Sequence, residues 1–165
     1  MSDRAGKLTP RSYSLAQILL HWVIAALVVW QLVFGESMGE VERQGAAADA
    51  STVFLADTHI WAGFAILVLV LLRIVLRLAQ GAPPPVDSSP ALALLAKLAH
   101  AAFYVLLVLV PLTGIGAYYL DLPVGGLHEL GKPLFIVLIA LHVAAALWHQ
   151  FVRHDGTLRR MLVPG

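Results

Sequence analysis

The chain has 165 residues, of which 59% are hydrophobic and 13% are charged, and its formal net charge is +1. Soluble domains carry about 25% charged residues, so the composition excludes a soluble enzyme and predicts an all-α integral membrane protein in one domain, residues 1–165. The small net charge argues against a nucleic-acid partner, and the absence of cysteine excludes disulfides, iron–sulfur clusters and covalently attached haem.

The first apolar run predicts a membrane helix over about 14–34, with Ser14 as its N-cap. A cleavable signal peptide is less consistent with this run, because the run is as long as a membrane span and contains Gln17, His21 and Gln31. Residues 36–57 are rich in Glu, Asp, Gly, Ala and Ser, and this composition predicts a polar loop.

Three further apolar runs predict helices over about 58–78, 90–120 and 127–153. The second run is interrupted by Arg73, and the prolines at 83–85 end it. Pro111 predicts a kink in the far half of the third run. The four predicted helices form a membrane four-helix bundle in contact with lipid.

Lysine and arginine predict the orientation of the bundle. If the helices alternate in direction, nine of the eleven fall on one side, and we expect that side to be cytoplasmic together with both termini. These nine are Arg4, Lys7, Arg11, Arg73, Arg77, Lys97, Arg153, Arg159 and Arg160. Only Arg43 and Lys132 lie opposite. The expected outer face is acidic, since seven carboxylates lie there: Glu36, Glu40, Glu42, Asp49, Asp57, Asp121 and Glu129.

Four histidines lie in or at the ends of the apolar runs, where an ionisable side chain is costly and indicates function. His128 and His142 are 14 residues apart in the fourth run. On a helix this spacing returns to nearly the same face and rises about 21 Å. With alternating helices, His21 is roughly level with His142 near the inner side, and His59 is level with His128 at the outer boundary.

Two facing imidazoles with no carboxylate or thiolate beside them fit haem, which supplies the other four iron ligands itself. Gly63 follows His59 by one helical turn, on the face where a larger side chain would strike a macrocycle. Gly114 and Gly116 could have a similar role on the third helix. Haem propionates need cationic partners at the membrane edge. The candidates for these partners are Arg73, Arg77 and Lys97.

Two more histidines lie near the inner side, and either could be a rival ligand. His149 follows His142 by seven residues on the same face, close in depth to His100. Together with Arg153, these residues could instead form a polar pocket for a quinone headgroup, whose carbonyls need donors and whose reduction needs protons.

These residues resemble the bacterial cytochrome b561 family of four-helix, di-haem membrane cytochromes. The resemblance covers nearly the whole chain and is most specific in the fourth helix and the tail. The residues that carry it are Tyr13, Ile18, Leu20, His21, Trp22, His59, Gly63, Arg73, Arg77, Lys97, His100, Tyr104, Pro111, Thr113, Gly114, Leu127, His128, Glu129, Leu141, His142, Val143, Ala145, Ala146, Leu147, His149, Arg153, Asp155, Gly156, Leu158, Arg159, Arg160 and Met161.

The resemblance implies two non-covalent b haems in a bacterial inner-membrane protein, one held by His21 and His142 and the other by His59 and His128. It implies an oxidoreductase that moves electrons from a periplasmic donor, superoxide in the best-understood members, to ubiquinone near His149. A quinone-linked anchor subunit of a dehydrogenase or hydrogenase remains the alternative, because such subunits share the ligand layout. The acidic outer face would slow an anionic donor, and Lys132, one turn after His128, is the candidate for local compensation.

Overall fold

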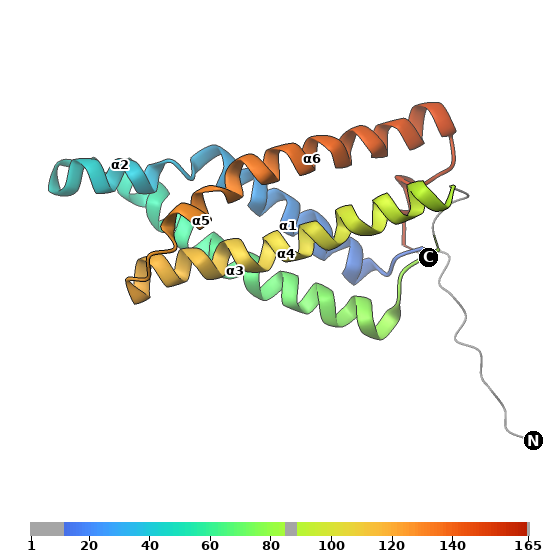
Figure 1. Cartoon of the computed structure of the whole chain (residues 1–165), viewed down its shortest axis with the longest axis horizontal. Helices are drawn as coiled ribbons and strands as arrows, with labels where there is room; N and C mark the ends of the chain where they lie inside the picture. Colours follow the sequence, from blue (N-terminus) through green and yellow to red (C-terminus); the bar gives the residue numbers. More distant parts are fainter. Residues whose placement is uncertain (1–11, 85–88, 165) are drawn as a thin grey trace, which may run out of the picture.

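The computed structural model describes residues 12–84 and 89–164. Within these residues it is built of helices without strands, and four helical segments are long and apolar enough to cross a membrane. Their main helices are α1 (Leu15–Phe34), α3 (Ala50–Gln80), α4 (Pro90–Leu120) and α6 (Gly131–Trp148). They lie side by side along one long axis and alternate in direction (Figure 1). The predicted all-α bundle is confirmed.

The start of α1 follows from its capping residues. The Ser14 hydroxyl accepts a hydrogen bond from the Gln17 backbone N–H at 3.3 Å, and the Gln17 side chain accepts one from the Ser14 N–H at 3.2 Å. This reciprocal pair satisfies backbone donors that the first turn of a helix leaves free. The predicted N-cap is therefore confirmed.

The prediction of a polar loop over 36–57 is wrong. That segment contains α2 (Ser37–Gln44), the short 3-10 helix η1 (Gly45–Ala47) and the first turns of α3. The Asp49 side chain accepts hydrogen bonds from the backbone N–H groups of Ser51 and Thr52 and so caps α3, which begins at Ala50, eight residues before the predicted start at Thr58. His59 consequently lies well inside α3 and not at its beginning.

The fourth span is broken near one end, where a single helix was predicted. The short helix α5 (Gly125–Glu129) is separated from α6 by Leu130. The end of the bundle that holds α2 and α5 is named the outer end after the predicted orientation, and the opposite end the inner end. Pro133 has no N–H to donate to the carbonyl of Glu129, so the regular ladder of hydrogen bonds cannot continue there. At the inner end α6 passes into a π-helical turn, η2 (His149–Arg153), and His154 then adopts a left-handed conformation with φ 50°. A last 3-10 turn, η3 (Arg159–Met161), lies in the tail.

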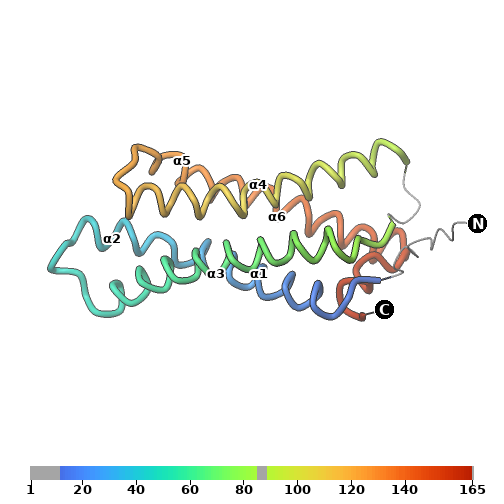
Figure 2. The backbone as a smooth tube through the Cα atoms, turned by 90° about the horizontal axis from the view of Figure 1, so that it is seen from below, coloured from blue at the N-terminus to red at the C-terminus, as the bar shows by residue number. Residues whose placement is uncertain are grey.

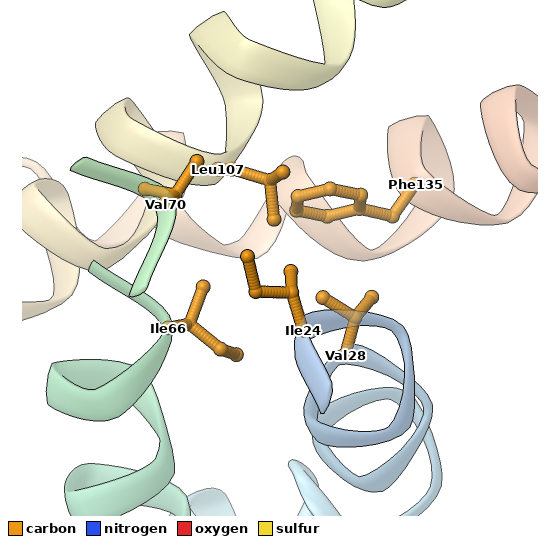
Figure 3. Close-up of a cluster of buried hydrophobic side chains, with 6 residues drawn as sticks. All are labelled: Ile24, Val28, Ile66, Val70, Leu107 and Phe135. Atoms are coloured by element: carbon orange, nitrogen blue, oxygen red, sulfur yellow. The ribbon is translucent and has the colours of Figure 1, made fainter. Parts of the chain in front are cut away.

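All four long helices contribute to an apolar core at mid-height of the bundle. Its buried members are Ile24, Val28, Ile66, Val70, Leu107 and Phe135 (Figure 3). On α1 the core residues lie between His21 and Gln31, and on α3 they lie between His59 and Arg73. On α4 Leu107 lies between His100 and Gly114, and on α6 Phe135 lies between Gly131 and His142. The core therefore separates the two ends of the bundle.

The C-terminal tail returns to the inner end, beside the start of α1 (Figure 2). The Trp22 indole N–H donates to the Met161 carbonyl at 2.8 Å, and the Arg160 guanidinium donates to the Pro84 carbonyl at 2.8 Å. This end also carries the described cations that were predicted to share one side: Arg73, Arg77, Lys97, Arg153, Arg159 and Arg160. Arg4, Lys7 and Arg11 lie outside the described residues.

Candidate haem sites

The outer pair of histidines meets between α3 and α5. The ring centres of His59 and His128 are 5.9 Å apart. A bond of about 2 Å from metal to imidazole nitrogen, with the ring centre about 1 Å behind that nitrogen, puts two rings on opposite sides of one iron about 6 Å apart. The separation of this pair therefore fits a shared haem iron.

His128 is held by the backbone of α4. Its Nδ1 lies 2.8 Å from the Val110 carbonyl oxygen, which can only accept, so Nδ1 carries the proton. A Cβ atom added to Gly114 would lie 2.9 Å from Cε1 of His128. Gly114 thus leaves room for the imidazole ring, whereas the sequence suggested room for a macrocycle. The lone pair on Nε2 remains available for iron, as is usual for metal-ligating histidines with a carbonyl partner.

His59 lies against the C-terminal end of α1. A Cβ atom added to Gly35 would lie 3.3 Å from both Cε1 and Nδ1 of His59. The Gln31 side-chain amide donates to the His59 carbonyl at 2.9 Å. Gln31 and Gly35 were not predicted as site residues, because neither lies in sequence near the histidine that it contacts. Among the described residues, His59 Nδ1 and Gln31 Oε1 are the buried side-chain polar atoms without a hydrogen-bond partner.

The inner histidines form a wider cluster of rings. The ring centres of His21 and His142 are 6.3 Å apart, a separation that also fits two ligands of one iron. The ring centre of His100 is 5.7 Å from that of His142, so distance leaves His100 as a rival partner. Phe103 at 5.3 Å completes the surroundings of His142, and Trp22 contacts His21 with a centre separation of 5.2 Å.

The chemistry of these donors suits haem. Across residues 12–84 and 89–164, no three or more histidine or carboxylate side chains gather closely enough to hold a metal ion by themselves. Haem already supplies four ligands to its iron, so one imidazole on each face is sufficient. The two histidine pairs lie on either side of the apolar core, and each would supply two imidazoles.

Arg73 and Arg77 lie at the inner end, near a small polar pocket. The Arg73 guanidinium donates to the Gln17 carbonyl at 2.7 Å, and both arginines line this pocket together with Tyr13, Gln17 and Tyr104. The guanidinium has further N–H groups that this single bond does not use. Lys97 is exposed on the second turn of α4. The role of these cations as propionate partners stays a prediction.

Gly63 faces α1. The nearest atom to a Cβ atom added there is Nε2 of Gln31, at 3.5 Å. An added Cβ atom would therefore make only an ordinary van der Waals contact with the glutamine amide. The contact of Gly63 with a macrocycle stays a prediction.

The inner polar residues bind to separate partners. His149 Nδ1 lies 2.5 Å from an Asp155 carboxylate oxygen, whereas His100 Nδ1 lies 2.6 Å from the Ala96 carbonyl of its own helix. Burial raises the pKa of Asp155, but hydrogen bonds from His149 and Thr157 outweigh it and leave that pKa at about 2. Asp155 was predicted only as part of the family pattern. In the structure it anchors the tail to the end of α6.

Both predicted outer cations are paired with glutamates. Lys132 Nζ lies 2.5 Å from a Glu36 carboxylate oxygen, and Arg43 pairs with Glu40 one turn earlier on α2. The charge of Lys132 is thus compensated by Glu36, and the outer end keeps its acidic balance.

Comparison with known proteins finds relatives over nearly the whole chain. The sequence pattern of prokaryotic cytochrome b561 matches residues 12–164. A cytochrome b562 of Cereibacter sphaeroides is 35% identical over 92% of this chain and 96% of its own length. A probable superoxide oxidase, CybB, of Yersinia pestis is 30% identical over the same shares of the two chains. Cytochrome b561 homolog 1 of Escherichia coli is 27% identical over 91% of this chain and 96% of its own.

Proposed function

The chain belongs to the prokaryotic cytochrome b561 family of membrane electron-transfer proteins, and on that premise we propose that it oxidises superoxide at its outer end and reduces ubiquinone at its inner end. The observation that carries the proposal is the presence of two histidine pairs, with ring separations of 5.9 and 6.3 Å, on opposite sides of one apolar core. Two redox centres at these heights would connect the two faces of the membrane.

The proposed ligands are His59 and His128 for an outer haem b and His21 and His142 for an inner haem b. Haem iron with two imidazole ligands exchanges one electron at a time and has no open position that favours oxygen activation. The protein holds the imidazoles and keeps water away from the space between the sites with Ile24, Ile66 and Leu107. Arg73, Arg77 and Lys97 are proposed to neutralise propionates.

The reaction balances as a two-electron process. Two superoxide anions each lose one electron and leave as two molecules of dioxygen. Ubiquinone takes up the two electrons with two protons and becomes ubiquinol. The name of the Yersinia pestis relative supports superoxide as the donor.

The inner end supplies groups suited to the quinone. The proton on His149 Nδ1 is fixed by Asp155, so Nε2 of that ring is left as the atom that can accept a proton or a hydrogen bond. We propose His149, with His100 and Arg153, as the quinone site. The lysines and arginines of this end support a cytoplasmic location for it and for both termini.

The acidic outer end provides an electrostatic test of the donor. Glu36→Gln removes the charge that offsets Lys132, so the rate of superoxide oxidation should rise a few-fold at low salt and by less at high salt. Lys132→Met should lower it. Equal rates in all three proteins would argue against superoxide approaching past Lys132.

The direct experiment is stopped-flow reduction of the purified, haem-loaded protein by superoxide, with ubiquinone as the acceptor. The proposal predicts haem reduction faster than spontaneous dismutation of superoxide, followed by formation of ubiquinol. Haem reduction no faster than dismutation would reject the superoxide reaction.

The paired outer cations favour a second candidate, a quinone-linked anchor for a redox protein. A surface on which Lys132 and Arg43 are already neutralised by glutamates would attract a basic protein partner better than an anion. This candidate predicts that a soluble dehydrogenase or hydrogenase subunit reduces the outer haem and co-purifies with the chain.

A further inference from the structure

Two buried polar atoms near the outer histidine pair have no hydrogen-bond partner, so in this structure they are not bonded to each other either. They are Oε1 of Gln31 and Nδ1 of His59, and within the described part of the chain they are the side-chain atoms of this kind. An amide oxygen can only accept a hydrogen bond, whereas an imidazole nitrogen can donate one. Buried groups are rarely left in this state, so the coincidence of an unused acceptor and an unused donor needs a physical reason.

Gln31 is fixed beside the histidine that it would serve. Its Nε2 donates to the His59 carbonyl at 2.9 Å, and that nitrogen packs against Gly63, where an added Cβ atom would lie 3.5 Å away. Exchanging the amide oxygen and nitrogen would bring two acceptors together at this carbonyl, so the chemistry sets the orientation of the amide. The free atom of Gln31 is therefore the oxygen.

The other ring of the pair, His128, has a hydrogen bond to a backbone carbonyl that His59 lacks. His128 Nδ1 donates to the Val110 carbonyl, and this bond fixes the tautomer in which Nε2 has a lone pair for iron. His59 has no bond of this kind to a backbone carbonyl. Its tautomer would be left undefined unless a side chain supplies the acceptor.

We propose that Gln31 is a positioning residue for the outer haem, whose Oε1 accepts the His59 Nδ1 proton when Nε2 binds iron. The bond selects the tautomer of His59 and raises the electron donation of the ring to iron, which stabilises the oxidised state. Gln31 thereby lowers the reduction potential of the outer haem relative to a site without this acceptor. The inference rests on the proposed pair of His59 and His128.

The test is a redox titration of the haem-loaded protein with three single variants. Gln31→Met keeps the length of the side chain but removes the acceptor, so the midpoint potential of the outer haem should rise. Gln31→Glu loses the same amide donor to the His59 carbonyl as Gln31→Met but provides a stronger acceptor, so that potential should fall. Gln17→Met is the matched control, since Gln17 lies 14 residues earlier on the same helix and bonds to Gly81 at the other end. It should leave the outer potential unchanged. The single-haem variant His142→Ala identifies which wave belongs to the outer haem.

Low-spin ferric electron paramagnetic resonance provides a second readout, since it reports the ligand field of each iron. Opposite displacements of the outer signal in Gln31→Met and Gln31→Glu support the inference. Loss of the outer haem in Gln31→Met with retention in Gln31→Glu supports it too, because only the acceptor differs. Unchanged potentials, displacements in the same direction, or loss of haem in both variants would overturn it.

The variant His59→Ala separates this inference from the function proposed above. If His59→Ala keeps both haems, the ligand pair is wrong and the role of Gln31 is wrong with it. If His59→Ala loses one haem while the Gln31 variants leave the potentials unchanged, the ligand pair stands and the role of Gln31 alone is rejected.

Discussion

The outer and inner histidine pairs are held by different parts of the chain. At the outer pair, the Val110 carbonyl binds His128, and Gly114 and Gly35 leave space for His128 and His59, so both rings pack against backbone although only His128 is bonded to it. At the inner pair, the surroundings of His142 are side chains, namely His21, His100 and Phe103.

This difference predicts different tolerance to substitution. A ring bonded to a main-chain carbonyl and packed on a glycine cannot move without moving a helix, because both contacts belong to the backbone. A ring among side chains can repack by rotation about side-chain bonds. We therefore expect the outer site to be the more rigid of the two and the inner site to be the more adaptable.

The largest expected effect is loss of a haem from either site alone. His128→Ala and His142→Ala should each lower the haem content of the purified protein from two per chain to one, since each removes a different proposed ligand. The ratio of haem to protein, from a pyridine haemochrome spectrum, measures this. If one substitution removed both haems, the two sites would be coupled and the comparison between them would fail.

The comparison of the two sites also depends on whether His21 or His100 is the second ligand of the inner haem, beside His142. His21→Ala should lose the inner haem, whereas His100→Ala should keep it, although the His100 ring centre is the nearer to His142, at 5.7 Å against 6.3 Å. His100 Nδ1 is bonded within its own helix at the Ala96 carbonyl, and α1 is the helix that the depth argument pairs with α6. The haem content and the spectrum of the two variants decide between them. Loss of haem in His100→Ala with retention in His21→Ala would exchange their roles.

A smaller effect is expected from adding one side chain at the outer site. In Gly114→Ala the new Cβ atom would lie 2.9 Å from the His128 ring, which the Val110 bond prevents from moving freely. Overpacking of this kind costs about 1–3 kcal/mol, so haem should dissociate from the outer site roughly 5-fold to 150-fold faster. Gly125→Ala is the control, because a Cβ atom there meets no atom within 4 Å. Equal dissociation rates in the two variants would show that the backbone around His128 yields easily.

Much of the fold could be predicted from sequence because membrane helices depend on long apolar runs. The run over 90–120 coincides with α4, and the Ser14 cap fixes the start of α1. The proximity of His59 to His128 and of His21 to His142 follows from depth in alternating helices, since a helix rises by a constant amount per residue.

Other features could not be predicted in this way. The polar composition of 36–57 suggested a loop, but the Asp49 cap and neighbouring helix partners stabilise helices there. Gln31 was noted only as a polar residue in an apolar run, because its contact with His59 depends on how two helices pack across 28 positions of sequence. Lys132 was predicted as an outer cation that compensates locally for the acidic face, and its pairing with Glu36 joins residues 96 positions apart.

The smallest expected effect is at the inner end, where it tests whether the side chain of Asp155 holds the tail in place. The pKa of Asp155 is about 2 in the folded protein, below the ordinary value of about 3.9 for an aspartate. A lowered pKa means that the stabilisation by this carboxylate is complete above about pH 4 and is lost as the pH falls from about 4 towards about 2. Hydrogen exchange should therefore show the Thr157 amide, which donates to Asp155 at 3.1 Å, losing protection over that range.

In Asp155→Asn the amide should be less protected at neutral pH, and the acid-dependent step should be absent. The Val110 carbonyl that holds His128 at the outer site does not titrate, so that hydrogen bond itself contributes no such step in either protein. An identical acid profile in the variant would mean that other contacts of the tail, such as Trp22 with Met161, hold this end without the carboxylate.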